Sequence, residues 1–327
     1  MAAPHRADLR RLAAIAAITA LLAAAGCAHR GWDQPPREGW KVVTSDHFVV
    51  RTDGAAHEYQ PVIDRLEDMY EALSASFFAG MPVAPIDVLL FSRERDFKAI
   101  APKNLVGFFT SKIARLEGGL LVFSSDGEDF ELVANTAAHE LAHRFLVEVS
   151  ERVPTWLHEG FAKYVGASQV RGDLVVFDAA ATKPHQVVAD PLPLARVLSS
   201  SGNDFHGADA RAQYLTAWML MRQLLGNPGP GSISRFQKLV ARSAVESSSV
   251  AQAAAVSEAF EGAAMVDIER AIAVSHRGLV RGVRRPAGQA SVAVKIKRQG
   301  RSPLQVAPAD RLEIFRLRAE LRDHQGD

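Results

Sequence analysis

The clearest hydrophobic pattern in the chain is an apolar stripe that recurs every four residues near its middle. The stripe consists of Val133, Ala137, Leu141, Phe145 and Val149. This period predicts an amphipathic helix, and Asp129 is placed to cap its first turn. A shorter stripe follows at Leu157, Phe161 and Val165. It predicts a second helix, and Pro154 suits the first turn of that helix because its missing N–H would have no partner there.

Upstream, the pattern alternates between short apolar runs and helical spacing. The apolar runs are rich in β-branched and aromatic residues, which favours strands. We expect strands at residues 41–43, 47–51, 85–91 and 118–124, and helices at 61–78 and 93–100. Phe108 is expected to begin extended or irregular chain.

Downstream, the pattern is mainly helical. We expect helices at 193–199, 211–225, 234–242, 249–260, 265–276 and 308–322, and strands at 174–177 and 291–297. Segments rich in proline, glycine or polar residues at 184–193, 199–207 and 227–231 are expected to be loops. This order of elements predicts an α+β fold, with a small N-terminal mixed sheet followed by a helical lobe.

The first central helix carries His139-Glu140-Leu141-Ala142-His143, an H-E-x-x-H motif. A helix has about 3.6 residues per turn, so His139 and His143 lie one turn apart on one face and can reach one metal ion. Leu141 lies roughly 200° around the helix from each histidine. The apolar stripe can therefore face the core while the histidines face a cleft.

A catalytic zinc ion usually takes three protein ligands and leaves one position for water. The motif supplies two ligands, so the sequence must supply a third. Glu159 is the candidate, because its separation from His143 fits the end of one helix, a turn and the start of the next. It lies off the apolar stripe of the second helix and can point back toward the metal. The alternative is an ordinary amphipathic helix with solvated His and Glu side chains.

Together the two motifs resemble those of the gluzincin clan of zinc metallopeptidases. The segment Trp156-Leu157-His158-Glu159-Gly160 is similar to the second motif of bacterial gluzincin-type peptidase domains. The resemblance extends over roughly Trp40 to His276 but is specific only over Asn135 to Tyr164. It implies a zincin-like fold with a thermolysin-like core, in which an edge strand lies over the active-site helix.

The resemblance also implies a role for each motif residue. His139, His143 and Glu159 would bind Zn²⁺, and Glu140 would be the general base. Many gluzincins carry an acidic residue four positions after the third ligand, where it orients a metal-bound histidine, but this chain has Lys163 there. The orienting group must then lie elsewhere, or zinc binding is weaker.

His158 stands directly before Glu159 in the second motif. Neighbouring side chains on a helix point about 100° apart. Because Glu159 is expected to face the metal, His158 is expected to point away from it and to have a structural role.

The strand expected at 118–124 has two interpretations. In gluzincins the corresponding edge strand borders the cleft and pairs with the substrate backbone, which provides main-chain hydrogen bonds with little reading of side chains. The alternative is an ordinary core strand, and the sequence does not decide between them.

Tyr214 also has two interpretations. Gluzincins often place a tyrosine or histidine downstream of the motifs to bind the oxyanion, and a phenol aimed at that charge would stabilise the transition state. The resemblance makes Tyr214 a candidate catalytic residue, ahead of His206 and His185. The alternative is a core tyrosine on the amphipathic helix expected at 211–225.

Composition narrows the function classes only slightly. The chain has 327 residues, of which 48% are hydrophobic and 23% are charged, so it can bury a substantial core. Its formal net charge of +1 gives no reason to expect nucleic acid as a partner.

Residues 1–27 are expected to lie outside the core. Three arginines precede an apolar run at 12–25, which is short for a membrane span and typical of a signal peptide. The run leads into the sequence LLAAAGC, which resembles a bacterial lipobox and implies cleavage before Cys27 and attachment of lipid to it. The alternative is a plain signal peptide with an incidental cysteine. Cys27 is the only cysteine, so it cannot form a disulfide within the chain.

The remaining chain is expected to form three segments: a flexible tether at 28–39, a peptidase domain at 40–276 and a basic extension at 277–327. From 277 to 301 there are eight Lys or Arg residues and no Asp or Glu. A solvated extension is expected, and contact with anionic lipid or envelope polymer is the alternative.

The function that the sequence predicts is zinc-dependent hydrolysis of peptide bonds in peptides or proteins, at a lipid-anchored position in the bacterial cell envelope. The alternative is a non-catalytic envelope lipoprotein that keeps zinc as a structural or peptide-binding element. The sequence does not fix the substrate or the oligomeric state.

Overall fold

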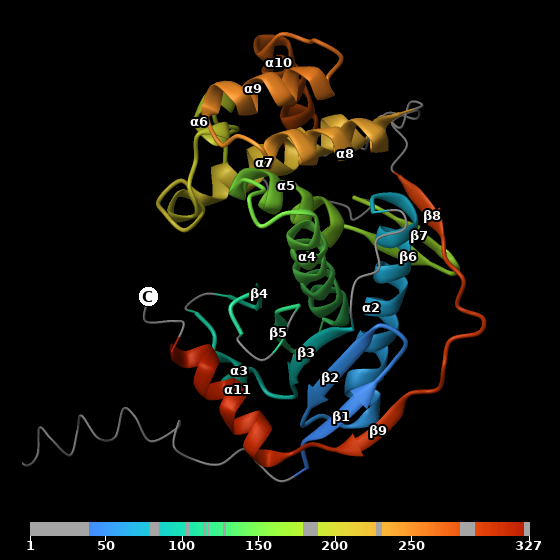
Figure 1. The fold of residues 1–327 in the computed structure, drawn as a ribbon. Helices are drawn as coiled ribbons and strands as arrows, with labels where there is room; N and C mark the ends of the chain where they lie inside the picture. The colour runs from blue at the N-terminus through green and yellow to red at the C-terminus, as the bar shows by residue number, and fades with distance from the viewer. Residues whose placement is uncertain are drawn as a thin grey trace, which may run out of the picture.

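The computed structural model describes residues 39–78, 85–102, 105–113, 116, 118–126, 129–178, 189–226, 231–281 and 292–323. These residues form an α+β fold, in which a mixed sheet packs on helix α4 (Phe130–Val149) and a mainly helical region follows (Figure 1). This confirms the predicted fold class at that level. The leader with Cys27, the tether up to residue 38 and His185 lie outside the described residues, so the predictions for them stay predictions. Within the described ranges, no helix is long and apolar enough to span a bilayer.

The main sheet has six strands in the order β4-β5-β3-β2-β1-β9. Their bounds are β1 (Lys41–Thr44), β2 (Phe48–Thr52), β3 (Ile86–Phe91), β4 (Gly107–Thr110), β5 (Leu120–Ser124) and β9 (Gln305–Pro308). The three central strands β2, β3 and β5 run parallel, whereas β4, β1 and β9 are antiparallel to their neighbours.

The structure decides between the two interpretations of the strand expected at 118–124. This strand is β5, which lies between β4 and β3, and all five of its residues are buried. It is therefore a core strand, because an apolar strand buried on both faces belongs inside a sheet. The edge strand beside β5 is β4, which includes Phe108, where the sequence indicated only extended or irregular chain, and β9 forms the opposite edge.

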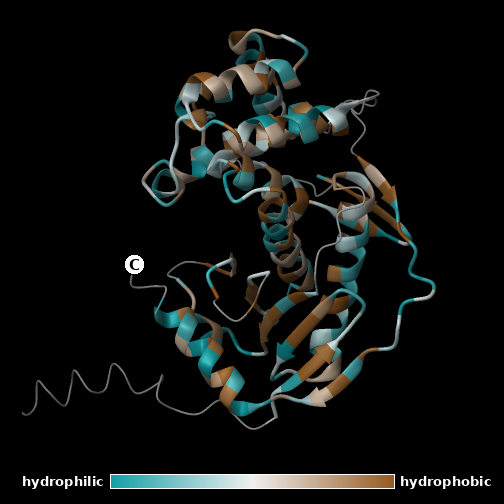
Figure 2. Cartoon of the chain, in the orientation of Figure 1, coloured by the Kyte–Doolittle hydropathy of each residue, from teal (hydrophilic) through white to brown (hydrophobic). Residues whose placement is uncertain are grey.

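Each face of the main sheet packs against a separate hydrophobic cluster. Along β3, Val88 and Leu90 face one hydrophobic cluster, which includes residues of α2 (Ala56–Ser76) and α4. Leu89 and Phe91 face the other cluster, which includes residues of α3 (Glu94–Lys98) and α11 (Arg311–Asp323). This alternation follows from the two-residue period of a strand. Figure 2 shows hydrophobic residues along the strands of the main sheet.

Helix α4 forms as its sequence predicts. The Asp129 carboxylate accepts hydrogen bonds from the backbone N–H groups of Glu131 at 3.0 Å and Leu132 at 3.4 Å, which confirms the predicted cap. Leu141 and Phe145 are fully buried, whereas Val149 at the end of the stripe is 39% exposed.

Helix α2 begins at Ala56, five residues earlier than expected, with Pro61 inside it. The Glu58 carboxylate accepts a hydrogen bond from the N–H of Ala55 at 2.5 Å. This cap stabilises a first turn that the hydrophobic spacing does not reveal, because the turn is largely exposed.

The helical region matches the predicted helices closely. It contains α5 (Thr155–Gly166), α6 (Leu194–Leu198), the 3₁₀ turn η2 (Gly202–Phe205), α7 (Ala210–Leu225), α8 (Ser232–Ser243), α9 (Ser249–Ala259) and α10 (Met265–Val280). A small second sheet pairs β6 (Gln169–Arg171) and β8 (Ala293–Lys295) with β7 (Leu174–Val176) between them. Of these strands, β6 was not predicted.

The basic segment after residue 291 belongs to the fold. β8 and β9 each extend a sheet, and α11 buries Ile314, Leu317 and Leu321 against the second cluster. The buried Asp68 carboxylate of α2 accepts hydrogen bonds from Arg301 Nη2 at 2.8 Å and Arg298 Nε at 3.0 Å. The expectation of a solvated extension is therefore wrong for residues 292–323, because two of the basic side chains pair with a buried acid rather than with solvent.

Gly160 allows α5 and α7 to pack closely, and its substitution should be costly. A Cβ atom at this position would lie 2.6 Å from the backbone oxygen of Ala217. We expect Gly160→Ala to lower the free energy of unfolding by about 1–3 kcal/mol, as overpacking does, measured by urea denaturation. Gly278→Ala is the matched control, because a Cβ atom at the helical Gly278 would meet no neighbouring atom within 4 Å and alanine favours a helix by about 0.5–1 kcal/mol. Equal stabilities of the two variants would contradict this account of the packing.

Candidate metal centre

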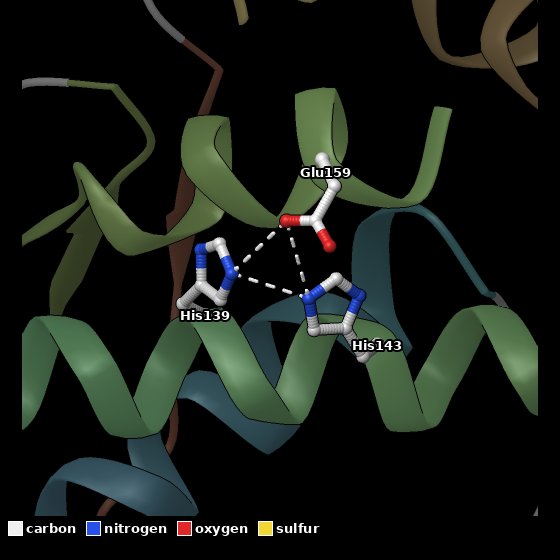
Figure 3. A group of neighbouring side chains, drawn as sticks. All are labelled: His139, His143 and Glu159. Carbon is white, nitrogen blue, oxygen red and sulfur yellow. Dashed lines mark hydrogen bonds and ion pairs between the residues drawn. The ribbon is translucent and has the colours of Figure 1, made fainter. Parts of the chain in front are cut away.

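Three side chains predicted as metal ligands converge between α4 and α5 (Figure 3). Nε2 of His139 lies 3.1 Å from Nε2 of His143. Oε2 of Glu159 lies 3.5 Å from the first of these nitrogens and 3.7 Å from the second. The three side chains are 20%, 12% and 17% exposed, so water and ions can still reach them.

These separations, 3.1, 3.5 and 3.7 Å, lie within a few tenths of an ångström of what a single tetrahedral ion requires. Ligand atoms about 2.0–2.2 Å from a tetrahedral metal lie roughly 3.3–3.6 Å from one another. In addition, Oε2 of Glu159 is buried and has no hydrogen bond of good geometry, so a cation would satisfy it. His139, His143 and Glu159 therefore form a group that can hold a metal ion.

The local sequence brings α5 close enough to α4 for this convergence. Gly166 lies against α4, where a Cβ atom would stand 3.0 Å from the backbone oxygen of Asn135 and 3.2 Å from Cβ of His139. The predicted apolar stripe of α5, Leu157, Phe161 and Val165, is fully buried. This packing directs the opposite side of α5, with Glu159, toward the histidines.

The charges at the site suit metal binding. Burial lowers the pKa of His143 to about 3, so its ring is neutral at pH 7 and a nitrogen lone pair is available. Burial alone would raise the pKa of Glu159, but contact with His139 and the charges of His143 and His139 outweigh it, and the pKa falls to about 2. For His139, burial acts to lower the pKa, but Glu159 and Glu140 together raise it. The carboxylate of Glu159 and the neutral imidazole of His143 are the forms that bind metals, and His139 must release the proton that its raised pKa favours when a cation binds.

Glu140 lies beside the three ligand residues without being one of them. Its side chain is buried. Burial raises the pKa of Glu140 to about 7, although the nearby backbone N–H of Phe109 in strand β4 acts to lower this pKa. The carboxyl group can therefore exchange a proton near neutral pH.

Tyr214 of α7 also reaches the site. Its partly buried ring packs edge-on against Phe205, with centroids 5.1 Å apart. Burial, followed by the charge of Glu159, raises the pKa of Tyr214. The phenol thus lies next to a ligand carboxylate, and its role in catalysis stays a prediction. His206 is exposed just after η2 and is not part of the metal group.

Two contacts of the site were not anticipated from the sequence. Nδ1 of His158 lies 3.4 Å from Nδ1 of His143, so the expectation that His158 points away from the site is wrong. An angle of about 100° on α5 still leaves both His158 and Glu159 on the half of the helix that faces α4. The second contact is that of Phe109 with Glu140. The position of His158 next to a ligand could have indicated the first contact, whereas no pattern in the sequence indicated the second.

The comparisons with known proteins assign no function to this site. No protein-family model matches the chain, and no curated protein matches it.

Removal of the third ligand tests the centre directly. We expect Glu159→Ala to raise the zinc dissociation constant more than about a hundredfold, because the loss of a ligand should exceed the 10–100-fold cost of losing a supporting residue. The measurement is competition with a chromophoric chelator. Glu151→Ala, which removes an exposed carboxylate just after α4, is the matched control and should bind zinc as wild type does. Wild-type affinity in Glu159→Ala would remove Glu159 from the centre.

Proposed function

We propose that the protein is a zinc metallopeptidase of gluzincin type with a zincin-like fold. One observation carries the proposal: two imidazoles and a carboxylate converge, while a second carboxylate, Glu140, lies beside them on the same helix without being a ligand. A metal centre with a structural role alone would have no need of a buried acid beside its ligands.

The donor set favours zinc. Two imidazoles and one carboxylate with a further position left for water are typical of catalytic zinc sites. Ligands at right angles in an octahedral site, as for non-haem iron, would lie about 3.0 Å apart. The two oxygen-to-nitrogen separations here, 3.5 and 3.7 Å, are wider, whereas the nitrogen-to-nitrogen separation of 3.1 Å is close to that value, so the choice of zinc rests on the donor set.

The roles of the side chains follow from their positions. Zinc held by the three ligands would supply Lewis acidity toward water and the scissile carbonyl. Glu140 would take a proton from the attacking water and deliver it to the leaving amine, which is efficient for a group with a pKa near the working pH. Tyr214 would donate a hydrogen bond to the oxygen on which negative charge develops.

The edge strand supports a peptide substrate. Among the residues that the structure describes, β4 pairs with β5 alone, and Phe109 of β4 lies near Glu140. An extended peptide can add to such an edge through main-chain hydrogen bonds. We therefore propose for β4 the substrate-pairing role that was one of two alternatives for residues 118–124, with peptides or proteins in extended conformation as substrates.

We also propose that lipid on Cys27 anchors the protein at the periplasmic face of a bacterial envelope membrane. The support is the order of basic residues, apolar run and cysteine in the leader. Absence of fatty-acid label from the full-length protein expressed in bacteria would contradict it.

A non-catalytic zinc lipoprotein is the second candidate. Lys163 favours it, because the residue stands where gluzincins often carry the acid that orients a ligand histidine. Measurements on Glu140 distinguish the two candidates.

In the peptidase, Glu140 moves a proton and does not hold zinc. We therefore expect Glu140→Gln to keep wild-type zinc content and melting temperature while hydrolysis of a mixed peptide library falls at least about a hundredfold. Glu131→Gln, on the exposed first turn of the same helix, is the matched control and should cleave at the wild-type rate. Undiminished cleavage by folded, zinc-loaded Glu140→Gln would rule out this mechanism, and a zinc-loaded wild type that cleaves nothing would favour the second candidate.

Tyr214 should act on turnover rather than on metal binding. We expect Tyr214→Phe to keep wild-type zinc affinity and to lower the hydrolysis rate by roughly tens to a thousandfold, as the loss of an oxyanion donor does. Tyr59→Phe, at a buried tyrosine of α2, is the matched control for removal of a hydroxyl group. An unchanged rate in Tyr214→Phe would make Tyr214 a packing residue only.

A further inference from the structure

The second ring nitrogen of His143 faces a residue outside the metal group. Nε2 of His143 lies 3.1 Å from Nε2 of His139 and 3.7 Å from Oε2 of Glu159. Nδ1, on the other side of the ring, lies 3.4 Å from Nδ1 of His158. The two rings have centroids 5.6 Å apart and planes inclined by 35°. The His143 ring therefore lies between the other two metal-group residues on one side and His158 on the other.

The chemistry of imidazole decides what this contact can do. When Nε2 of a neutral imidazole gives its lone pair to a metal, Nδ1 carries the ring hydrogen and becomes a donor. The His143 side chain is only 12% exposed, so an unpaired N–H there would be costly. Nδ1 of His158 is within hydrogen-bonding distance and can accept when His158 carries its own hydrogen on Nε2.

We propose that His158 is the positioning residue of the metal centre: its Nδ1 accepts a hydrogen bond from Nδ1–H of His143 and holds that ring with Nε2 directed at the metal. The inference rests on the metal site of the proposed function. It adds the group that orients a ligand histidine, which the sequence motifs do not identify.

The proposal gives His143 a supporting group in a chain that has Lys163, and no acid, four residues after Glu159. Lys163 occupies that position with an exposed side chain, and its charge acts on His139 and Glu159. An ammonium group has no lone pair, so it cannot accept a hydrogen bond from a ligand histidine. His158 offers a neutral acceptor instead, from the residue directly before the third ligand.

α5 holds His158 in a fixed position. Trp156 and Leu157 before it and Phe161 after it are fully buried, and Gly160 packs against the backbone of α7. A supporting group must be held this firmly to orient a ligand. Glu159 and His158 are neighbours on one packed helix. The packing of α5 therefore positions both the third ligand, Glu159, and the residue that supports His143.

The test compares variants with and without an acceptor at this position. In His158→Asn the amide oxygen can take the place of the ring Nδ1, whereas His158→Phe keeps a ring and has no acceptor. We expect the zinc dissociation constant of the full-length protein, measured by chelator competition, to rise about 10–100-fold in His158→Phe and to stay within about threefold of wild type in His158→Asn. His57→Phe, on the exposed first turn of α2, is the matched control and should keep the wild-type value.

Two results would overturn the proposal while leaving the metal centre in place. One is wild-type zinc affinity in His158→Phe. The other is equal weakening in His158→Phe and His158→Asn, which would attribute the effect to ring packing rather than to the hydrogen bond. A wild-type protein that binds no zinc would instead reject the metal centre, and the positioning role with it.

A measurement on the wild type decides the matter if His158→Phe does not fold. Proton–nitrogen correlation spectra of the zinc-loaded protein, with isotope-labelled histidine, show which ring nitrogen carries hydrogen. We expect hydrogen on Nδ1 of His143 and on Nε2 of His158, with His158→Asn used to identify the His158 signals. Hydrogen on Nδ1 of His158 would contradict the proposal, because that nitrogen could then accept nothing.

Discussion

The close crossing of α4 and α5 is the constraint on which the metal group depends. One helix places two imidazoles side by side through its own period, but a third ligand can join them only if a second backbone passes within reach. Gly166 of α5 allows this helix to approach α4, and Gly160 of α5 allows it to approach α7. The result is a Glu159 oxygen 3.5 and 3.7 Å from the two histidine nitrogens.

The same crossing gives the two carboxylates of the site different chemistry. Glu159 lies among imidazoles, which outweigh its burial and lower its pKa to about 2. Burial dominates for Glu140 and raises its pKa to about 7. Two acids whose surroundings separate their pKa values in this way are suited to different roles. The ionised one can hold a cation and the other can carry a proton.

The rest of the fold holds this crossing from both sides. The sheet supports α4 from below, with β4 beside Glu140, and α7 covers α5 and contributes Tyr214 (Figure 1). The chain after residue 291 adds strands to both sheets and covers the far face of the main sheet with α11. A site assembled from neighbouring helices is therefore supported by segments far apart in the sequence.

The sequence by itself determined what depends on local periodicity and short spacing. The four-residue stripe predicted α4, Asp129 its cap, and the two motifs the metal group of His139, His143 and Glu159. Only the tertiary structure decided that β4 rather than β5 is the edge strand, that residues 292–323 belong to the fold, and that His158 faces a ligand. The reason is physical: a helical or strand period shows which side of an element is buried, whereas the order of strands and the crossing of helices depend on contacts between residues that no local pattern relates.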